Sequence, residues 1–263
     1  MKRLAEAAIQ TLKKFNIAMV KQDSLQRLME NNGKADDIEL LLKLPDKQVS
    51  LALRHLKKSQ AQLRQDIFVL SEVDFMKNGF FVEFGATNGI NLSNTYLLES
   101  DFGWNGILSE PARIWHDDLC KNRKSSIETR CVWSDSDHSL VFNEVEKAEL
   151  STIDTFNSSD FDHHARNRKN SHTYEIKTIS LLDLLIKHNA PKIIDYLSID
   201  TEGSEFQILS SFDFSKYQFR VITCEHNFTP EREEIYKLLT SHGYVRKFED
   251  ISKFDDWYVK AEA

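Results

Sequence analysis

From about residue 66 onward, short apolar runs alternate with segments of helical periodicity, and this alternation constrains the fold more than any other feature of the sequence. The apolar runs are rich in aromatic and β-branched residues, which predicts buried strands, and the amphipathic segments between them predict helices. Alternating strands and helices favour a doubly wound α/β fold around a mostly parallel sheet. The expected strands are residues 80–84, 106–108, 131–133, 141–142, 193–199 and 219–224, with residues 257–259 as a final edge strand. The expected helices are residues 93–100, 114–122, 181–188 and 230–241.

Residues 1–58 have a different, helical pattern. Apolar residues recur there at helical spacing, and neither a glycine-rich loop nor a cluster of catalytic side-chain types interrupts them. Gly33 is expected to end one helix and Asp46 to cap the last one. The apolar stripes of these helices need a partner. We therefore expect a helical region, residues 1–58, that packs on a second domain, residues 59–263. A homodimer contact is the other way to cover the apolar stripes.

The charge balance limits the partners of the chain. Its 41 acidic and 34 basic residues give a formal net charge of −7, whereas proteins that bind phosphate backbones usually carry a basic face. A nucleic-acid substrate is therefore not expected. The three cysteines are far apart and form no CxxC pair, which predicts reduced thiols. No stretch approaches the roughly 18 apolar residues of a membrane-spanning helix, and the N-terminus has no signal-peptide pattern, so we expect a cytoplasmic protein.

The first local motif is the sequence EFGATNG at residues 83–89. An apolar strand ends in an acidic residue and then turns through two glycines, which is expected to lead into a helix. Gly85 would let the backbone approach a ligand closely, and Gly89 would permit a tight turn. A ligand would then lie beyond the carboxyl end of the strand, against a helix N-terminus. The dinucleotide fingerprint G-x-G-x-x-G is absent, which argues against a nicotinamide cofactor. The alternative interpretation is an ordinary glycine turn.

The second motif is the acid Glu110, which follows the expected strand at residues 106–108. An acid at the end of the second strand of such a sheet can accept hydrogen bonds from both ribose hydroxyls of a nucleotide. The alternative is an exposed loop acid, but the distance from Gly89 along the chain favours the ribose role.

Two further motifs follow later strands. Asp200 and Glu202 come directly after the strand at residues 193–199, and Glu225 with His226 comes at the end of the strand at residues 219–224. Clustered carboxylates are costly unless they share a ligand, a cation or a proton, so we expect a functional site. The alternative interpretations are acids that stabilise a helix N-terminus, above all Glu205, and a histidine that merely packs.

Residues 155–173 contain almost no apolar side chains. We expect this segment to be an exposed insertion, and we expect it to help cover or select the substrate.

Taken together, the spaced motifs resemble the FkbM family of methyltransferases. The resemblance covers the sequence from residue 59 to the C-terminus, and residues 1–58 lie outside it. The segments that carry it are residues 59–66, 81–89, 93–95, 98–99, 103–106, 110–111, 196–205 and 225–227.

The resemblance implies a Rossmann-like class I methyltransferase fold and S-adenosyl-L-methionine as the methyl donor. It also implies O-methylation, commonly of a hydroxyl on a sugar or on a polyketide-like compound. By position, the methionine end of the donor would be lined by Glu83, Gly85, Ala86 and Gly89, the ribose held by Glu110, and the adenine flanked by Trp133 and Ser134. Gln62, Gln65, Asp66 and Asn94 would reach the methionine moiety or the acceptor.

Methyl transfer to a hydroxyl needs a base, since a neutral hydroxyl is a poor nucleophile. We expect His226 to take the proton, with Asp200 and Glu202 orienting it or the hydroxyl. The second route is Mg²⁺, because Asp200 with Glu225 and Asn227 resembles the metal-site layout of catechol-type O-methyltransferases. Other functions left open are a non-catalytic scaffold that binds the donor, an oxidoreductase, and a methyltransferase acting on a polyketide-like compound or on nitrogen.

Overall fold

The computed structural model of the chain describes residues 22–145, 152–153 and 171–261. The chain divides into two compact units, residues 1–42 and residues 43–263. This division falls earlier than the domain boundary predicted after residue 58, which stays a prediction. In the first unit the structure describes helix α2 (Gln22–Lys43), which continues into the second unit at its last residue. The predicted helix end at Gly33 is wrong, because α2 runs through it. A glycine inside a helix costs only about 1 kcal/mol relative to alanine, and the residues around it continue the helix.

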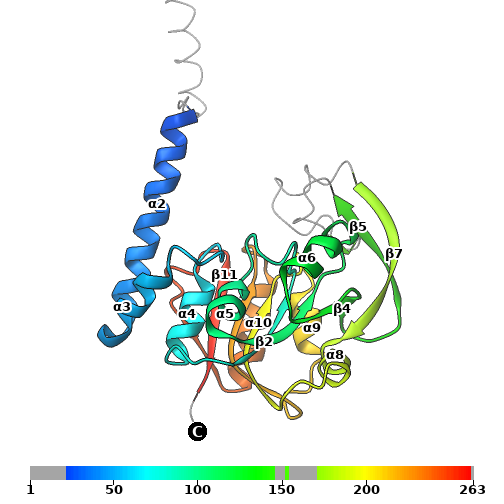
Figure 1. Ribbon diagram of the computed structural model, residues 1–263. Coiled ribbons are helices and arrows are strands. Elements are labelled where there is room, and N and C mark those ends of the chain that lie inside the picture. The colour runs from blue at the N-terminus through cyan, green and yellow to red at the C-terminus, as the bar shows by residue number, and fades with distance from the viewer. Residues whose placement is uncertain (1–21, 146–151, 154–170, 262–263) are drawn as a thin grey trace, which may run out of the picture. The chain divides into compact units, whose positions relative to one another are not determined.

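The second unit is built on a sheet of seven strands in the order β10-β11-β9-β8-β1-β2-β3. Figure 1 labels strands β2 and β11 of this sheet, which helices surround. The strands β3, β2, β1, β8 and β9 pair in parallel, and β11 runs antiparallel to both of its neighbours. The predicted α/β fold with a mostly parallel sheet is therefore confirmed. The strands are β1 (Phe80–Phe84), β2 (Asn105–Ser109), β3 (Ser126–Glu128), β8 (Ile193–Ile199), β9 (Gln218–Glu225), β10 (Tyr244–Lys247) and β11 (Asp255–Lys260).

Helices cover both faces of this sheet. On one face, a continuous apolar core joins the helices α8, α9 and α10 to Val82 of β1, Leu197 of β8 and Ile222 of β9. Helix α4 lies on the other face, where it contacts α3, α5 and β9. Its Phe68 ring stacks on the ring of Trp257, with 4.6 Å between the ring centroids. The helices are α3 (Asp46–His55), α4 (Gln65–Glu72), α5 (Tyr96–Phe102), α6 (His116–Asn122), α8 (Leu181–Lys187), α9 (Glu205–Ser210) and α10 (Glu231–Ser241), with the 3-10 turn η1 (Arg113–Trp115) before α6.

The predicted edge strand at residues 257–259 lies inside the sheet. It belongs to β11, which pairs with β9 on one side and with β10 on the other, so that β10 forms the edge. The apolar side chains of Trp257 and Tyr258 agree with this interior position, since both are fully buried. The edge strand β10 was not expected from the sequence, because its residues Tyr-Val-Arg-Lys are short and half polar.

A second sheet of four strands stands apart from the first, in the order β4-β7-β5-β6. The predicted strand at residues 131–133 is β4 (Cys131–Trp133), but it pairs with β7 (Ser171–Ser180) and not with the main sheet. The other strands are β5 (Ser139–Val145) and β6 (Thr152–Ile153). Most of the predicted insertion at residues 155–173 lies outside the described residues, but its last three residues belong to β7, where they pair with β5.

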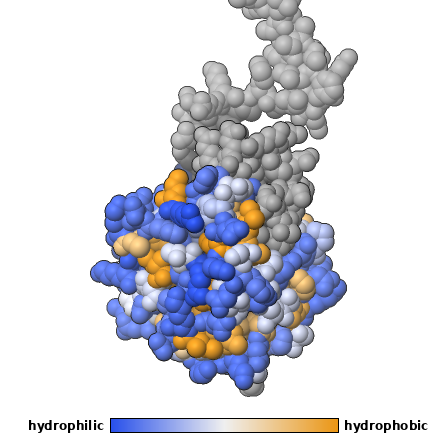
Figure 2. Space-filling view, turned by 90° about the vertical axis from the view of Figure 1, so that its right-hand side faces the viewer, coloured by the Kyte–Doolittle hydropathy of each residue, from blue (hydrophilic) through white to orange (hydrophobic). Residues whose placement is uncertain are grey.

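The described surface carries no single large apolar face in the view of Figure 2, where apolar side chains form small separate groups among polar ones. Among the described helices, none combines the length and the apolar composition needed to cross a bilayer.

Candidate functional site

The site predicted from the sequence lies where the strand order of the main sheet reverses. Strand β1 pairs with β2 on one side and with β8 on the other, and the chain visits β2 and β3 before it returns to β8. Ligands of open α/β sheets bind at this switch point, beyond the carboxyl ends of the strands. Gly85 follows β1 and Asp200 follows β8, so the first and third motifs meet there.

Gly85 and Gly89 are needed for protein contacts. Both have positive φ angles, 76° and 82°, which favour glycine. A Cβ atom on Gly85 would lie 2.3 Å from the backbone oxygen of Asp200, and one on Gly89 would lie 2.6 Å from Cγ of Arg123. The glycines thus let the loop approach β8 and α6. Gly89 makes the predicted tight turn, since its backbone N–H donates to the backbone oxygen of Ala86 at 2.8 Å. The close approach of a ligand to Gly85 stays a prediction.

The predicted helix at residues 93–100 is present, but it begins three residues later than expected. Helix α5 begins only at Tyr96. The segment between Gly89 and Tyr96 is fixed by Glu83, which is 2% exposed and accepts hydrogen bonds from the Ser93 hydroxyl, the Asn94 backbone N–H at 2.6 Å and the Thr95 hydroxyl at 2.6 Å. The carboxylate of Glu83 therefore holds this loop, and its contact with the donor stays a prediction.

Glu110 links the loop of residues 85–89, here named the glycine loop, to the end of β2. Its side chain is buried, and its two oxygens accept hydrogen bonds from the backbone N–H groups of Thr87 at 2.7 Å and Ala112 at 2.8 Å. The pKa of Glu110 is raised to about 7, mainly because the carboxyl group is buried. The two hydrogen bonds lower this pKa, and the charges of Glu144 and Glu83 raise it further. Each carboxylate oxygen has a second lone pair, so the group can still accept bonds from two hydroxyls.

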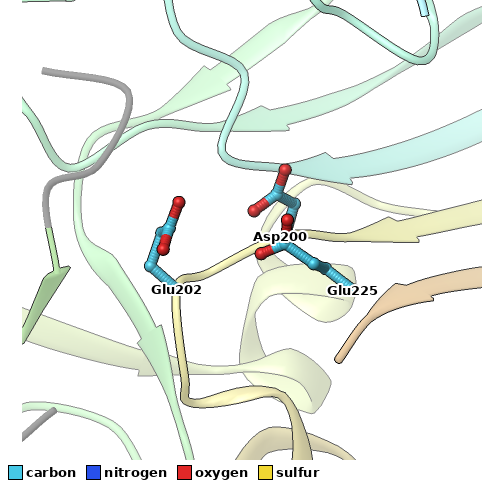
Figure 3. Close-up of side chains that lie close together, drawn as sticks. All are labelled: Asp200, Glu202 and Glu225. Atoms are coloured by element: carbon cyan, nitrogen blue, oxygen red, sulfur yellow. The ribbon is translucent and has the colours of Figure 1, made fainter. Parts of the chain in front are cut away.

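Three carboxylates gather at the ends of β8 and β9. Oxygen atoms of Asp200, Glu202 and Glu225 all lie within 4.8 Å of one another. Figure 3 shows the three side chains side by side. Burial, together with the mutual repulsion of these acids, raises the pKa of both Asp200 and Glu225 well above the ordinary value. The amide of Asn227 donates a hydrogen bond of 2.8 Å to Glu225. The predicted meeting of the third and fourth motifs is therefore present for these carboxylates.

The carboxylate of Glu205, by contrast, binds the turn that precedes α9. Its Oε1 accepts hydrogen bonds from the Thr201 backbone N–H at 2.9 Å and the Thr201 hydroxyl at 2.8 Å. It thus occupies the start of α9, in agreement with the alternative of an acid at a helix N-terminus.

His226 does not join the carboxylates, although its neighbour Glu225 does. The side chain of His226 is only 1% exposed, and its Nε2 lies 3.8 Å from a carboxylate oxygen of Asp256. Its Nδ1 accepts a hydrogen bond of 2.9 Å from the backbone N–H of Phe228. Successive residues of a strand point to opposite faces, which separates the imidazole from Asp200. Burial lowers the pKa of His226. The geometry therefore gives no support to the expectation that Asp200 and Glu202 orient this imidazole.

Residues 83–247, well over half of the chain, match the family model of the methyltransferase FkbM domain. The chain belongs to the FkbM methyltransferase family. The match contains the glycine loop, Glu110 and the three clustered carboxylates, so the site described above lies inside the FkbM domain.

Solved structures resemble the FkbM chain at low identity. An FkbM methyltransferase from Methylobacillus flagellatus is 12% identical, with a TM-score of 0.44, and the match covers 87% of this chain and 59% of that one. A precorrin-6Y C5,15-methyltransferase from Geobacter metallireducens is 10% identical, with a TM-score of 0.40, over 74% of this chain and 87% of that one. The chain thus spans less than two thirds of the length of the first of these structures. No curated protein matches the sequence.

The remaining predicted site residues differ in their exposure. Gln62 is exposed, and Asn94 is partly exposed with its amide donating to the Ser198 hydroxyl at 3.0 Å. Gln65 and Asp66 are buried: Gln65 donates to Asp255 at 2.9 Å, and Asp66 accepts from the Ser59 hydroxyl at 2.7 Å.

The predicted adenine residues follow β4 of the second sheet, since Trp133 is the last residue of that strand and Ser134 comes next. The main sheet's third strand is β3, which ends at Glu128. Residues 131–133 were the third strand expected from the sequence, and their place in the main sheet is wrong. The contact of Trp133 and Ser134 with adenine stays a prediction.

Sequence reasoning missed Arg123 and Asn122, which end α6 beside the glycine loop. Neither lies at a strand end or in a recognised spacing. From the sequence alone, an arginine that follows an amphipathic helix is expected to be exposed. The structure shows that Arg123 is buried.

Proposed function

We propose that this FkbM domain is an S-adenosyl-L-methionine-dependent O-methyltransferase that acts on a hydroxyl of a sugar or glycan. The observation that carries the proposal is the hydrogen bond between the Thr87 backbone N–H and Glu110. It joins the glycine loop to an acid at the end of the neighbouring strand, at the switch point of the sheet. A nucleoside that lay there would meet the loop and the acid together.

The residues present fit this donor chemically. Glu110 retains acceptor capacity for the two ribose hydroxyls. The carboxylates of Asp200, Glu202 and Glu225 are close enough to repel one another, so a cationic ligand beside them would relieve that repulsion. When bound, S-adenosyl-L-methionine supplies an electrophilic methyl group on a sulfonium.

We assign the proton transfer to the carboxylate pair rather than to His226. Asp200 and Glu225 are hydrogen-bonded to each other, and the pKa of each is raised by burial and by the other acids nearby. A raised pKa makes a carboxylate a better base. Both are partly exposed, whereas His226 is buried.

The direct test of the reaction is donor consumption in the presence of a panel of nucleotide sugars and glycans. We expect turnover with at least one member of the panel and none with amines of similar size. Turnover confined to amines would replace the hydroxyl acceptor with nitrogen, and turnover with polyketide-like alcohols alone would move the substrate class. A chain that binds the donor but consumes it with no acceptor of any class would be a scaffold, and binding of a nicotinamide cofactor instead would indicate an oxidoreductase.

Mg²⁺ gives a second candidate mechanism, favoured by the cluster of three carboxylates. Carboxylate oxygens are the ligands that Mg²⁺ prefers, and Asp200, Glu202 and Glu225 would hold it. The ion would supply a positive charge near the acceptor oxygen. EDTA should leave the rate unchanged if the carboxylate pair acts alone, whereas a rate lost with EDTA and restored by Mg²⁺ would establish the metal route.

The cytoplasmic location and the homodimer contact remain proposals that rest on composition and on the apolar stripes of the N-terminal region. Sedimentation of the full chain over a range of concentrations would test the second.

A further inference from the structure

The side chain of Arg123 is fully buried at the end of α6. Its Nε donates to Glu99 at 3.1 Å and its Nη2 to the Thr95 hydroxyl at 2.9 Å. Burial by itself would raise the pKa of Glu99, but the charge of Arg123 and nearby hydrogen bonds hold that pKa below its ordinary value. A buried guanidinium is costly unless it is paired in this way.

The third nitrogen of Arg123 reaches the glycine loop. Nη1 donates to the backbone oxygen of Gly89 at 3.0 Å and to the Ser93 hydroxyl at 3.2 Å. The preceding residue, Asn122, donates its amide to the backbone oxygen of Asn88 at 2.8 Å. Two consecutive side chains at the end of α6 therefore bind two consecutive carbonyls of the loop.

The loop is held from its other side by Glu110, through the Thr87 N–H. Between these anchors the backbone has positive φ values at Thr87, 47°, and at Gly89, 82°. A non-glycine residue with positive φ persists only when its surroundings enforce it. The contacts with α6 and with Glu110 supply that enforcement.

We propose that Asn122 and Arg123 are positioning residues for donor binding: they clamp the glycine loop in the conformation that presents the Thr87 N–H and Glu110 to the nucleoside. This inference rests on the proposed use of S-adenosyl-L-methionine. An ion pair that served only stability would need a positive charge between Glu83 and Glu99, which a lysine could also provide. The carbonyl of Gly89 and the hydroxyls require in addition the planar fork of arginine.

The test compares Asn122→Ala and Arg123→Lys with two controls. Lys124→Met removes a charge at the next residue, whose side chain is exposed. Leu239→Ala removes buried volume in α10, on the opposite face of the sheet from α5. It is the control for a variant that lowers the melting temperature without changing any contact of the glycine loop. For each variant we would measure the Kd for S-adenosyl-L-methionine by calorimetry below the melting temperature. Amide hydrogen exchange of residues 85–95 would be followed without donor.

We expect Arg123→Lys to weaken donor binding by about tenfold or more and Asn122→Ala by about threefold to tenfold, as for the loss of charged and neutral hydrogen bonds. Both should speed exchange in residues 85–95, and both controls should keep the wild-type Kd. Wild-type affinity in the two loop variants would overturn the inference, and so would an equal loss in Leu239→Ala at the same melting temperature. If the wild type does not bind the donor, the proposed function fails; faster exchange in Arg123→Lys would then show a loop anchor without a donor role.

Discussion

At the scale of single residues, Gly85 lies where the sequence predicted it, and the close approach that the structure shows there is to protein backbone. A glycine after a strand indicates a close approach, and the sequence suggested that the approaching group is a ligand. The structure shows the backbone of Asp200 at 2.3 Å from the position of a Cβ. The two strand ends that form the site are therefore close because residue 85 has no side chain.

We predict that Gly85→Ala destabilises the protein by about 2–4 kcal/mol, since it combines overpacking against backbone with a positive φ angle. Chemical denaturation measures the change. Gly33→Ala is the control, because no atom lies within 4 Å of its Cβ position in helix α2; it should be neutral or stabilise the chain by up to about 1 kcal/mol. A Gly85→Ala variant as stable as the wild type would contradict the packing described here.

Asp200 and His226 give a second residue-scale prediction. Asp200→Asn should keep the fold and lower kcat by about 10²–10⁴, the usual contribution of a general base. His226→Ala should lower the melting temperature, because it empties a buried position, while the rate per folded molecule stays close to that of the wild type. Turnover assays at a temperature where both variants are folded decide between them. The reverse pattern would return the base to His226, as the sequence had suggested.

At the scale of helices and strands, α4 attaches to the sheet through Phe68, whose ring stacks on Trp257 of β11. Both side chains are fully buried. Phe68→Ala and Trp257→Ala should each lower the free energy of unfolding by about 3–5 kcal/mol, and the double variant should lose about 0.5–1.5 kcal/mol less than the sum. Ile193→Ala, at a half-exposed position, is the control and should change little. Strictly additive losses would show that the two rings do not interact.

The sequence predicted the elements that are set by local pattern. Strands β1 and β8 are mostly apolar, and their predicted bounds agree with the structure. Pairing partners are set by distant contacts, which a local pattern does not contain. For that reason β11 was expected at the edge and β4 in the main sheet, although each segment was correctly predicted as a strand.

The same limit applies to the site. The clustering of Asp200 with Glu225 followed from the rule that parallel strands end at one edge, and it needed no further information. The roles of Glu83 and Arg123 depend on which neighbours they meet after the chain folds. Side-chain direction explains why His226 does not join the carboxylates although Glu225 does, since adjacent residues at a strand end face opposite sides.

At the scale of the whole molecule, burial of acids at one edge of the sheet makes stability depend on pH. The folded-state pKa of Glu110 is raised from 4.5 to about 7. Its stabilising contribution is therefore complete below about pH 4.5 and is lost as the pH rises to about 7. Asp66, raised from 3.8 to about 6 by burial, acts in the same sense, whereas His55 and His226, whose pKa values are lowered by burial, act in the opposite sense.

The contribution of Glu110 can be isolated by comparing the ligand-free wild type with Glu110→Gln. The variant should gain stability relative to the wild type as the pH rises from 5 to 8, by up to about 3 kcal/mol, because one unit of pKa shift corresponds to 1.36 kcal/mol. Denaturation at several pH values measures this difference. A difference that stays constant with pH would mean that Glu110 is ionised in the folded protein throughout the range.

Calorimetric titration of the full chain with S-adenosyl-L-methionine, for the wild type and for Glu110→Ala, tests the central claim most directly. Asp117→Ala, an exposed acid of α6, is the matched control. We predict that the wild type and the control bind the donor with equal affinity. Glu110→Ala should lose about 1.5–3 kcal/mol of binding free energy, the range for hydrogen bonds to a charged group, and Glu110→Gln should lose less. Equal affinity in all four proteins, or no binding by the wild type, would contradict the assignment of this edge of the sheet as the donor site.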